Sequence, residues 1–164
     1  RVLFRSTIFA AREGMDLETS LKSDCASLYP QVKALIDSGI KITALRDATR
    51  GGVSAVLNEW AKQSDICIEI EEEKIPISDE VKGICEMLGF EAMSLANEGT
   101  FVLAIPNEDA LKVLEVLQTF EYSKTASIIG KVTQQYEQRV ILNSQWGTKR
   151  FLDVPTGELL PRIC

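Results

Sequence analysis

The chain has 164 residues, of which 45% are hydrophobic and 26% are charged, and its formal net charge is −6. This length and composition indicate one globular domain with an adequate core, which buries roughly 68–70% of the surface of its unfolded chain. The negative charge argues against nucleic acid or an anionic membrane as a main partner. No apolar run approaches the ~20 residues of a membrane span and no signal peptide is recognised, so we expect the cytoplasm as the location.

The cysteine and histidine content limits the chemistry. No two cysteines form a C-x-x-C pair, so the sequence indicates neither a zinc site nor a disulfide framework, and we expect no metal site here. The chain has no histidine, so an acid–base role must fall to Asp, Glu, Lys, Cys or Tyr. The four cysteines are Cys25, Cys67, Cys85 and Cys164.

A short amphipathic helix is predicted after a polar connection at 14–26. Pro30 suits its first turn and Gly39 its end. Its apolar face is formed by Val32, Leu35 and Ile36.

The stretch 42–61 predicts a strand, a turn and a second helix. The strand covers 42–45 and the turn covers 46–50, with Thr49 as the N-cap. The helix that follows has the i, i+3, i+4, i+7, i+8 spacing of one buried face, at Val53, Val56, Leu57, Trp60 and Ala61.

Two glycines lie in the first turn of that helix. Because Gly51 and Gly52 carry no side chain, we expect the first backbone N–H groups to be open to an anion such as phosphate. Arg46 and Arg50 flank the turn and offer forked donors for a phosphate or carboxylate. The alternative is that the glycines only make a tight strand-to-helix turn.

A half-buried strand and a third helix follow. Residues 66–71 alternate apolar and polar, and the acidic residues 71–73 indicate a solvated edge. The helix begins after Ser78 and ends at Gly89, with Cys85 as a small buried hydrophobe on its apolar face.

Asn97 and Glu98 precede an apolar run at 101–105. A continuous apolar run predicts a central strand that is buried on both faces. We therefore expect Glu98 to lie at the mouth of the core, where partial desolvation raises the pKa of a carboxyl group. The alternative is an ordinary Asn-Glu-Gly turn before a strand.

The remaining elements complete an α+β domain. A fourth helix begins near Asn107, and strands are predicted at 126–132, 139–143 and 149–152, the last two forming a hairpin. Together the elements predict a mixed β-sheet covered by about four helices.

The tail 153–164 contains Pro155, Gly157 and Pro161, which disfavour regular structure, so we expect it to be mobile. It ends in Cys164. That residue is either an accident of a frayed end or a thiol on a flexible arm that carries a reactive group between sites.

Several of these motifs resemble one known family. Asp-Ala-Thr-Arg-Gly-Gly at 47–52, followed by Leu-Asn-Glu-Trp-Ala in the helix, resembles the C-terminal domain of the PurM-like ATP-dependent enzymes. These include aminoimidazole ribonucleotide synthetase, selenophosphate synthetase and the HypE-like hydrogenase maturation proteins. Asn-Glu-Gly at 97–99 and the terminal Pro-Arg-Ile-Cys are most similar to the HypE-like members, and the resemblance covers 7–164.

The resemblance implies a carbamoyl dehydratase with a PurM C-terminal-domain-like fold. Such proteins accept a carbamoyl group from HypF on the terminal cysteine, convert it with ATP to a thiocyanate, and pass cyanide to iron on a HypC–HypD complex. It implies that Cys164 is the carrier and that Glu98 is the base. The residues implied to hold phosphate are Asp47, Thr49, Arg50, Gly51 and Gly52, with support from Arg46 and Asn97.

The resemblance also implies an incomplete protein. Its N-terminal domain would supply most of the ATP and Mg²⁺ ligands and the core of a homodimer, so we expect the present chain to be inactive alone. We expect residues 1–6 to be a non-native remnant, residues 7–152 the domain and 153–164 the tail. The alternatives are another ATP-dependent synthetase of the superfamily and a non-catalytic carrier module.

Overall fold

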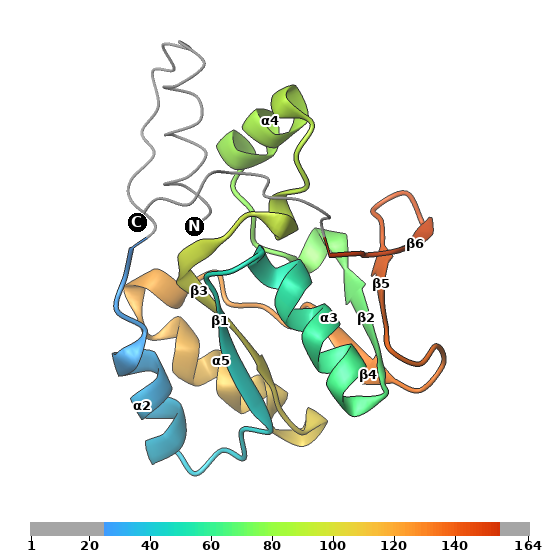
Figure 1. The fold of residues 1–164 in the computed structure, drawn as a ribbon. Helices are drawn as coiled ribbons and strands as arrows, with labels where there is room; N and C mark the ends of the chain where they lie inside the picture. Colours follow the sequence, from blue (N-terminus) through green and yellow to red (C-terminus); the bar gives the residue numbers. More distant parts are fainter. Residues whose placement is uncertain (1–24, 155–164) are drawn as a thin grey trace.

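The computed structural model describes residues 25–154 (Figure 1). The expectations for residues 1–6 and for the tail beyond residue 154, Cys164 included, lie outside the described residues. The helices of the described part are α2 (Tyr29–Asp37), α3 (Gly52–Ser64), α4 (Asp79–Leu88) and α5 (Ala110–Gln118). Its strands are β1 (Ala44–Ala48), β2 (Cys67–Glu71), β3 (Asn97–Ala104), β4 (Gly130–Thr133), β5 (Arg139–Asn143) and β6 (Lys149–Phe151).

The strands form two sheets, and α3 lies between them (Figure 1). One sheet is the antiparallel pair β1–β3, and the other is four-stranded in the order β4-β2-β5-β6. The β2–β5 pair is parallel whereas β2–β4 and β5–β6 are antiparallel, so the larger sheet is mixed. The predicted α+β class, with four helices and a mixed sheet, is confirmed.

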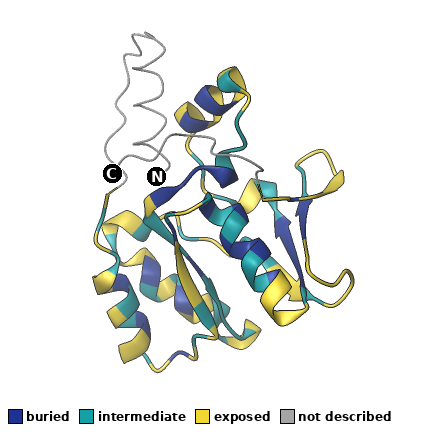
Figure 2. Ribbon diagram, in the orientation of Figure 1, coloured by how far each residue is buried: buried dark blue, intermediate teal, exposed yellow. Residues whose placement is uncertain are grey.

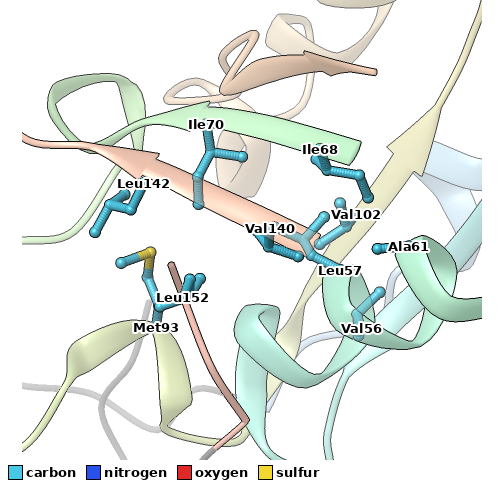
Figure 3. Close-up of a cluster of buried hydrophobic side chains, with 10 residues drawn as sticks. All are labelled: Val56, Leu57, Ala61, Ile68, Ile70, Met93, Val102, Val140, Leu142 and Leu152. Atoms are coloured by element: carbon cyan, nitrogen blue, oxygen red, sulfur yellow. The ribbon is translucent and has the colours of Figure 1, made fainter. Parts of the chain in front are cut away.

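The main core fills the space between α3 and the four-stranded sheet (Figure 3). It takes side chains from α3, β2 and β5, together with one residue each from β3, the short 3-10 helix η2 (Ala92–Ser94) and the segment after β6. These residues are Val56, Leu57, Ala61, Ile68, Ile70, Met93, Val102, Val140, Leu142 and Leu152. The predicted apolar face of α3 is therefore confirmed.

A second core lies between the β1–β3 pair and the helices α2 and α5. Leu35, Val113 and Leu117 are buried there, with Phe101 and Leu103 of β3 packed against them. Ile36 was predicted on the inner face of α2, but it is 62% exposed. The face that α2 buries instead includes Gln31, one turn before Leu35.

The strand predicted at 66–71 is present, but the expectation that it is only half-buried is wrong. β2 lies between β4 and β5, and its residues Cys67, Ile68, Glu69 and Ile70 are all buried. Glu71 accepts a hydrogen bond from Asn143 Nδ2 at 2.8 Å instead of facing solvent at an edge. Ile68 and Ile70 on one face of β2 pack in the main core, and on the other face Glu69 forms an ion pair with Lys131 of β4.

The prediction for β3 is only partly right. Its apolar run packs on both sides, Val102 against the main core and Phe101 against the second core, but in the run 101–105 only Val102 is buried. Within residues 25–154, β3 pairs only with β1 and is not a central strand.

The helix ending at Gly89 and the β5–β6 hairpin are as predicted. Among the described residues, no helix is long and apolar enough to cross a lipid bilayer.

Candidate functional site

The turn between β1 and α3 differs from its prediction. β1 runs to Ala48, so the exposed residues Arg46 and Asp47 lie on the strand and not in the turn. The N-cap of α3 is Gly51, with φ of +67°, and not Thr49. A left-handed residue is needed here, and glycine adopts that conformation without strain. The Thr49 hydroxyl instead donates to Asp47 Oδ1 at 3.3 Å.

Gly52 has a packing role that the sequence did not reveal. It is buried, and a Cβ added to it would lie 2.3 Å from the carbonyl oxygen of Met93 and 2.6 Å from that of Leu95. The missing side chain therefore allows α3 to approach the backbone around η2. Gly52 thus has a packing role in addition to its place in the first turn, because its Cβ position faces protein.

Two buried polar residues of α3 fix the turn in place, and the sequence analysis missed both. Ser54 Oγ donates to the carbonyl oxygen of Gly51 at 3.2 Å and lies 3.1 Å from Ser94 Oγ of η2. Asn58 Nδ2 donates to the carbonyl oxygens of Ser54, at 2.9 Å, and Leu152, at 2.7 Å. The sequence did contain one sign of this role. Ser54 and Asn58 are four residues apart in a helix, so their side chains lie on the same face.

The two candidate arginines are in different situations. Arg46 forms an ion pair with Glu59 of α3, which neutralises its charge locally. Arg50 is exposed, and the structure gives it no ion pair among the described residues. Arg50 is therefore the better placed of the two to meet an incoming anion.

The beginning of α3 has the properties of an anion site. The first N–H groups of a helix have no acceptor within the helix, and the helix dipole places partial positive charge at this end. α3 has 13 residues, so its dipole is well developed. Together with the guanidinium group of Arg50, these donors suit a phosphate group.

The strand pairing brings the second motif beside the first. Ala48, the last residue of β1, pairs with Asn97, the first residue of β3, whereas Asp47 pairs with Phe101. Residues 98–100 therefore bulge out of the ladder next to the turn. Bulges of this kind redirect side chains and are frequent beside active sites.

At this bulge, the paired residue Asn97 and its neighbour Glu98 differ sharply in exposure. Asn97 is 1% exposed, and its Oδ1 accepts a hydrogen bond from the Gly99 N–H at 3.0 Å. Glu98 is exposed, so the expectation that its carboxylate is partly desolvated is wrong for this domain. The reason is the bulge, which lifts residue 98 out of the ladder and away from the core.

The cysteines within the described residues are not equivalent. Cys67 and Cys85 are buried, whereas Cys25 is exposed. Burial raises the pKa of the Cys85 thiol, and the nearby carboxylates of Glu91 and Glu86 act in the same direction. Cys85 therefore behaves as the buried hydrophobe that was expected, with little thiolate character.

The fold and the turn between β1 and α3 agree with a known protein family. Residues 4–143 match the family described as AIR synthase related protein, C-terminal domain, and the chain therefore belongs to this family. It is 44% identical to carbamoyl dehydratase HypE of Escherichia coli over 160 residues, which cover 97% of this chain and 46% of that protein. It is also 44% identical to a putative hydrogenase expression/formation protein of Methanocaldococcus jannaschii over 157 residues, covering 96% and 46%.

Solved structures agree with these relatives. The chain is similar to a crystal structure of hydrogenase maturation protein HypE in complex with ATP, with a TM-score of 0.89 and 34% identity, over 98% of this chain and 49% of that one. It is also similar to HypE in a HypE–HypF complex, with a TM-score of 0.83 and 40% identity, over 90% and 48%. The chain thus spans about half the length of the relatives that it matches.

Proposed function

We propose that this chain is the C-terminal part of an ATP-dependent carbamoyl dehydratase that supplies cyanide ligands for [NiFe]-hydrogenase maturation. The observation that carries the proposal is the 44% identity to E. coli carbamoyl dehydratase HypE across 97% of the chain. The start of α3 and the bulge that carries Glu98 lie at the ends of two paired strands, and this arrangement supports the proposal.

The proposed reaction converts a thiocarboxamide into a thiocyanate on the protein's own terminus. The Cys164 thiol accepts a carbamoyl group from a HypF partner and becomes an S-carbamoyl group. Its oxygen attacks the γ-phosphate of ATP, both N–H protons are lost, and the C–O bond breaks as phosphate leaves. The products are a C≡N group on sulfur, ADP and phosphate. The cyano group then passes to iron on a HypC–HypD complex.

The phosphates are proposed to bind at the first turn of α3. The backbone N–H groups after Gly51 and the Arg50 guanidinium supply donors, and Asp47 and Thr49 lie at the adjoining strand end. Gly52 contributes by holding this turn against η2. A similar HypE structure is in complex with ATP, which supports nucleotide binding by this protein. Mg²⁺ and most nucleotide ligands are proposed to belong to an N-terminal domain, which also forms the core of a homodimer in the cytoplasm.

Glu98 is proposed as the base that removes an amide proton. Its carboxylate is exposed on the bulge, next to the strand end that leads into the turn. In the full-length protein we expect Glu98→Gln to accept the carbamoyl group normally and to form the cyano group at least about 10²-fold more slowly. Cyano formation is measured by the infrared C≡N stretch. A rapid rate in this variant would show that Glu98 is not the base. Slow cyano formation by Glu98→Gln would indicate that this domain takes part in the dehydration and is not a passive carrier.

Carbamoylation of Cys164 tests the proposal most directly. Full-length protein is incubated with HypF, carbamoyl phosphate and ATP, and the adduct is located by intact mass and peptide mapping. We expect modification of Cys164 and none of Cys25, which is exposed and serves as the matched internal control. Equal modification of a Cys164→Ala variant would contradict the carrier assignment.

A further inference from the structure

The peptide bond between Gly51 and Gly52, at the start of α3, has unusual conformational freedom. The two residues have φ of +67° and +66°, and glycine adopts positive and negative φ about equally well. A flip of a peptide plane changes ψ of the residue before it and φ of the residue after it. Because both residues are glycines here, the flip is sterically permitted, and a further contact is needed to keep one orientation.

The orientation of this peptide decides which polar group faces an anion at the start of α3. A trans peptide is planar, so the Gly51 carbonyl and the Gly52 N–H point in opposite directions. The carbonyl is directed along α3, where it accepts the Ala55 N–H at 3.3 Å. The Gly52 N–H is therefore directed away from the helix, like the other first N–H groups that have no acceptor within it. A flipped peptide would present a carbonyl oxygen to the anion instead.

The hydroxyl group of Ser54 holds this peptide in the orientation that suits an anion. Its Oγ donates to the Gly51 carbonyl oxygen at 3.2 Å, and the residue is 0% exposed, so water does not compete for the bond. The bond from the Ala55 N–H is longer than the usual range of about 2.7–3.2 Å, so the helix alone holds the carbonyl weakly. The bond from Ser54 therefore contributes a substantial part of the constraint.

Ser94 of η2 fixes the Ser54 hydroxyl in turn. The two Oγ atoms are 3.1 Å apart, and both residues are buried. A serine hydroxyl has one proton to donate, so when Ser54 donates to Gly51, Ser94 must donate to Ser54. The result is a chain of two hydrogen bonds from η2 to the N-cap carbonyl of α3. Hydrogen bonds in such a chain polarise one another, which strengthens them in a water-free interior.

We infer that Ser54 is a positioning residue for nucleotide binding. Its hydroxyl, held by Ser94, keeps the Gly51–Gly52 peptide oriented so that the Gly52 N–H faces a phosphate of ATP. This inference rests on the proposed function, which places the phosphates at the start of α3. Both serines are buried and act through the peptide without touching the ligand. Their effect therefore belongs to the affinity for ATP and not to the chemical step.

Ser54→Ala in the full-length protein tests the inference. We expect the dissociation constant for ATP, measured by calorimetry, to rise about 3- to 10-fold, the size of one lost hydrogen bond. The rate of cyano formation at saturating ATP should stay within about twofold of wild type. Ser144→Ala is the matched control, because the Ser144 hydroxyl also contacts a second hydroxyl, Thr148 Oγ1 at 2.6 Å, but in the β5–β6 turn. Its dissociation constant for ATP should stay within about twofold of wild type.

Ser94→Ala is a second variant, which reaches the same peptide from η2. We expect its dissociation constant for ATP to rise by less, about 2- to 4-fold. The double variant should bind ATP no more weakly than Ser54→Ala alone, because Ser94 acts through Ser54. Fully additive effects would contradict the chain of hydrogen bonds.

The ¹⁵N–¹H signal of Gly52 distinguishes positioning from a general loss of stability. In wild-type protein we expect ATP to shift this signal. In Ser54→Ala without ATP we expect it to broaden or split, because the peptide then exchanges between two orientations. Gly147 in the β5–β6 turn also has a positive φ and is the reference, whose signal should not change in either experiment.

Two results would overturn the inference. A dissociation constant for Ser54→Ala within about twofold of wild type would show that its hydroxyl does not position the peptide. An unchanged Gly52 signal in wild-type protein that binds ATP would show that this N–H does not face the phosphate, and this measurement decides the matter even if Ser54→Ala does not fold. Wild-type protein that binds no ATP would instead contradict the proposed function.

Discussion

The two sheets of this domain differ in how deeply their strands are buried. In β2, four consecutive residues are buried, whereas in β1 only Ala48 is, and Arg46 and Asp47 are exposed (Figure 2). The four-stranded sheet holds the main core, and the β1–β3 pair holds the candidate chemistry. The difference indicates that the main core and the proposed binding site lie on different sheets, with α3 between them.

Gly52 lies at the start of α3 in close contact with the backbone of residues 93–95, so we expect its substitution to give the largest effect. In Gly52→Ala the new Cβ meets two backbone carbonyls, and the residue keeps a φ of +66° that alanine disfavours. We expect a loss of about 3 kcal/mol or more, or roughly 6–12 °C in the melting temperature of this chain.

Gly39→Ala is the matched control for this prediction. Gly39 has a φ of +71°, but a Cβ there meets nothing within 4 Å, so the substitution adds backbone strain without a clash. We expect a loss of about 1 kcal/mol. Equal losses for the two variants would mean that the contact between α3 and η2 contributes little.

A pair of leucines compares the sheets directly. Leu142 of β5 is 0% exposed in the main core, and Leu45 of β1 is 37% exposed. We expect Leu142→Ala to lower the free energy of unfolding by about 2–5 kcal/mol, because it leaves a cavity, and Leu45→Ala to lower it by less than about 1 kcal/mol. Denaturant unfolding of both variants measures these changes. Comparable losses of unfolding free energy would show that the two sheets contribute equally to stability.

The two arginines sharpen the functional half of the comparison. Because Arg46 is already paired with Glu59, its loss should matter less to a nucleotide than the loss of Arg50. In the full-length protein we expect Arg50→Gln to raise the KM for ATP about 10-fold, the size of one charge-assisted hydrogen bond. The same change at Arg46 should raise it less than about threefold. Equal effects would remove Arg50 from the phosphate site.

Local pattern was sufficient for some of these features and not for others. The spacing of Val53, Val56 and Leu57 predicted the buried face of α3, because helix periodicity is set within a dozen residues. The burial of β2 was missed because its neighbours β4 and β5 come some sixty residues later in the chain. The alternation of apolar and polar residues along a strand does not predict which strands pair with it.

The candidate site shows the same limit. The sequence identified Gly52 and Asn97 as residues of interest, but their structural roles depend on contacts with distant segments. Gly52 meets the backbone of residues 93–95, and Asn97 pairs with Ala48. Glu98 was expected to be partly buried because a strand was expected to begin cleanly after it, and the bulge between 97 and 101 was not foreseeable from composition.

The smallest predicted effect concerns α4, whose buried residues Val81 and Cys85 pack with Leu95, the residue that follows η2. Its N-cap is Ser78, which makes no side-chain hydrogen bond to the helix backbone. A backbone N–H and the Ser78 hydroxyl instead lower the pKa of the Glu80 carboxyl group. Since the folded pKa is depressed, the resulting stability is present above the unfolded value and is lost as pH falls through the folded value.

We therefore expect Glu80→Gln to be slightly less stable than wild type at pH 7, and the difference to vanish as the pH falls below the folded pKa of Glu80. Urea unfolding midpoints between about pH 7 and pH 2.5 measure it. Glu86→Gln, on the same helix, is the control, because Glu86 is exposed and lies outside the first turn. A Glu80→Gln difference that stays constant with pH would mean that the side chain acts by packing. The packing of α4 on η2, which in turn contacts Gly52, would then not depend on the charge of Glu80.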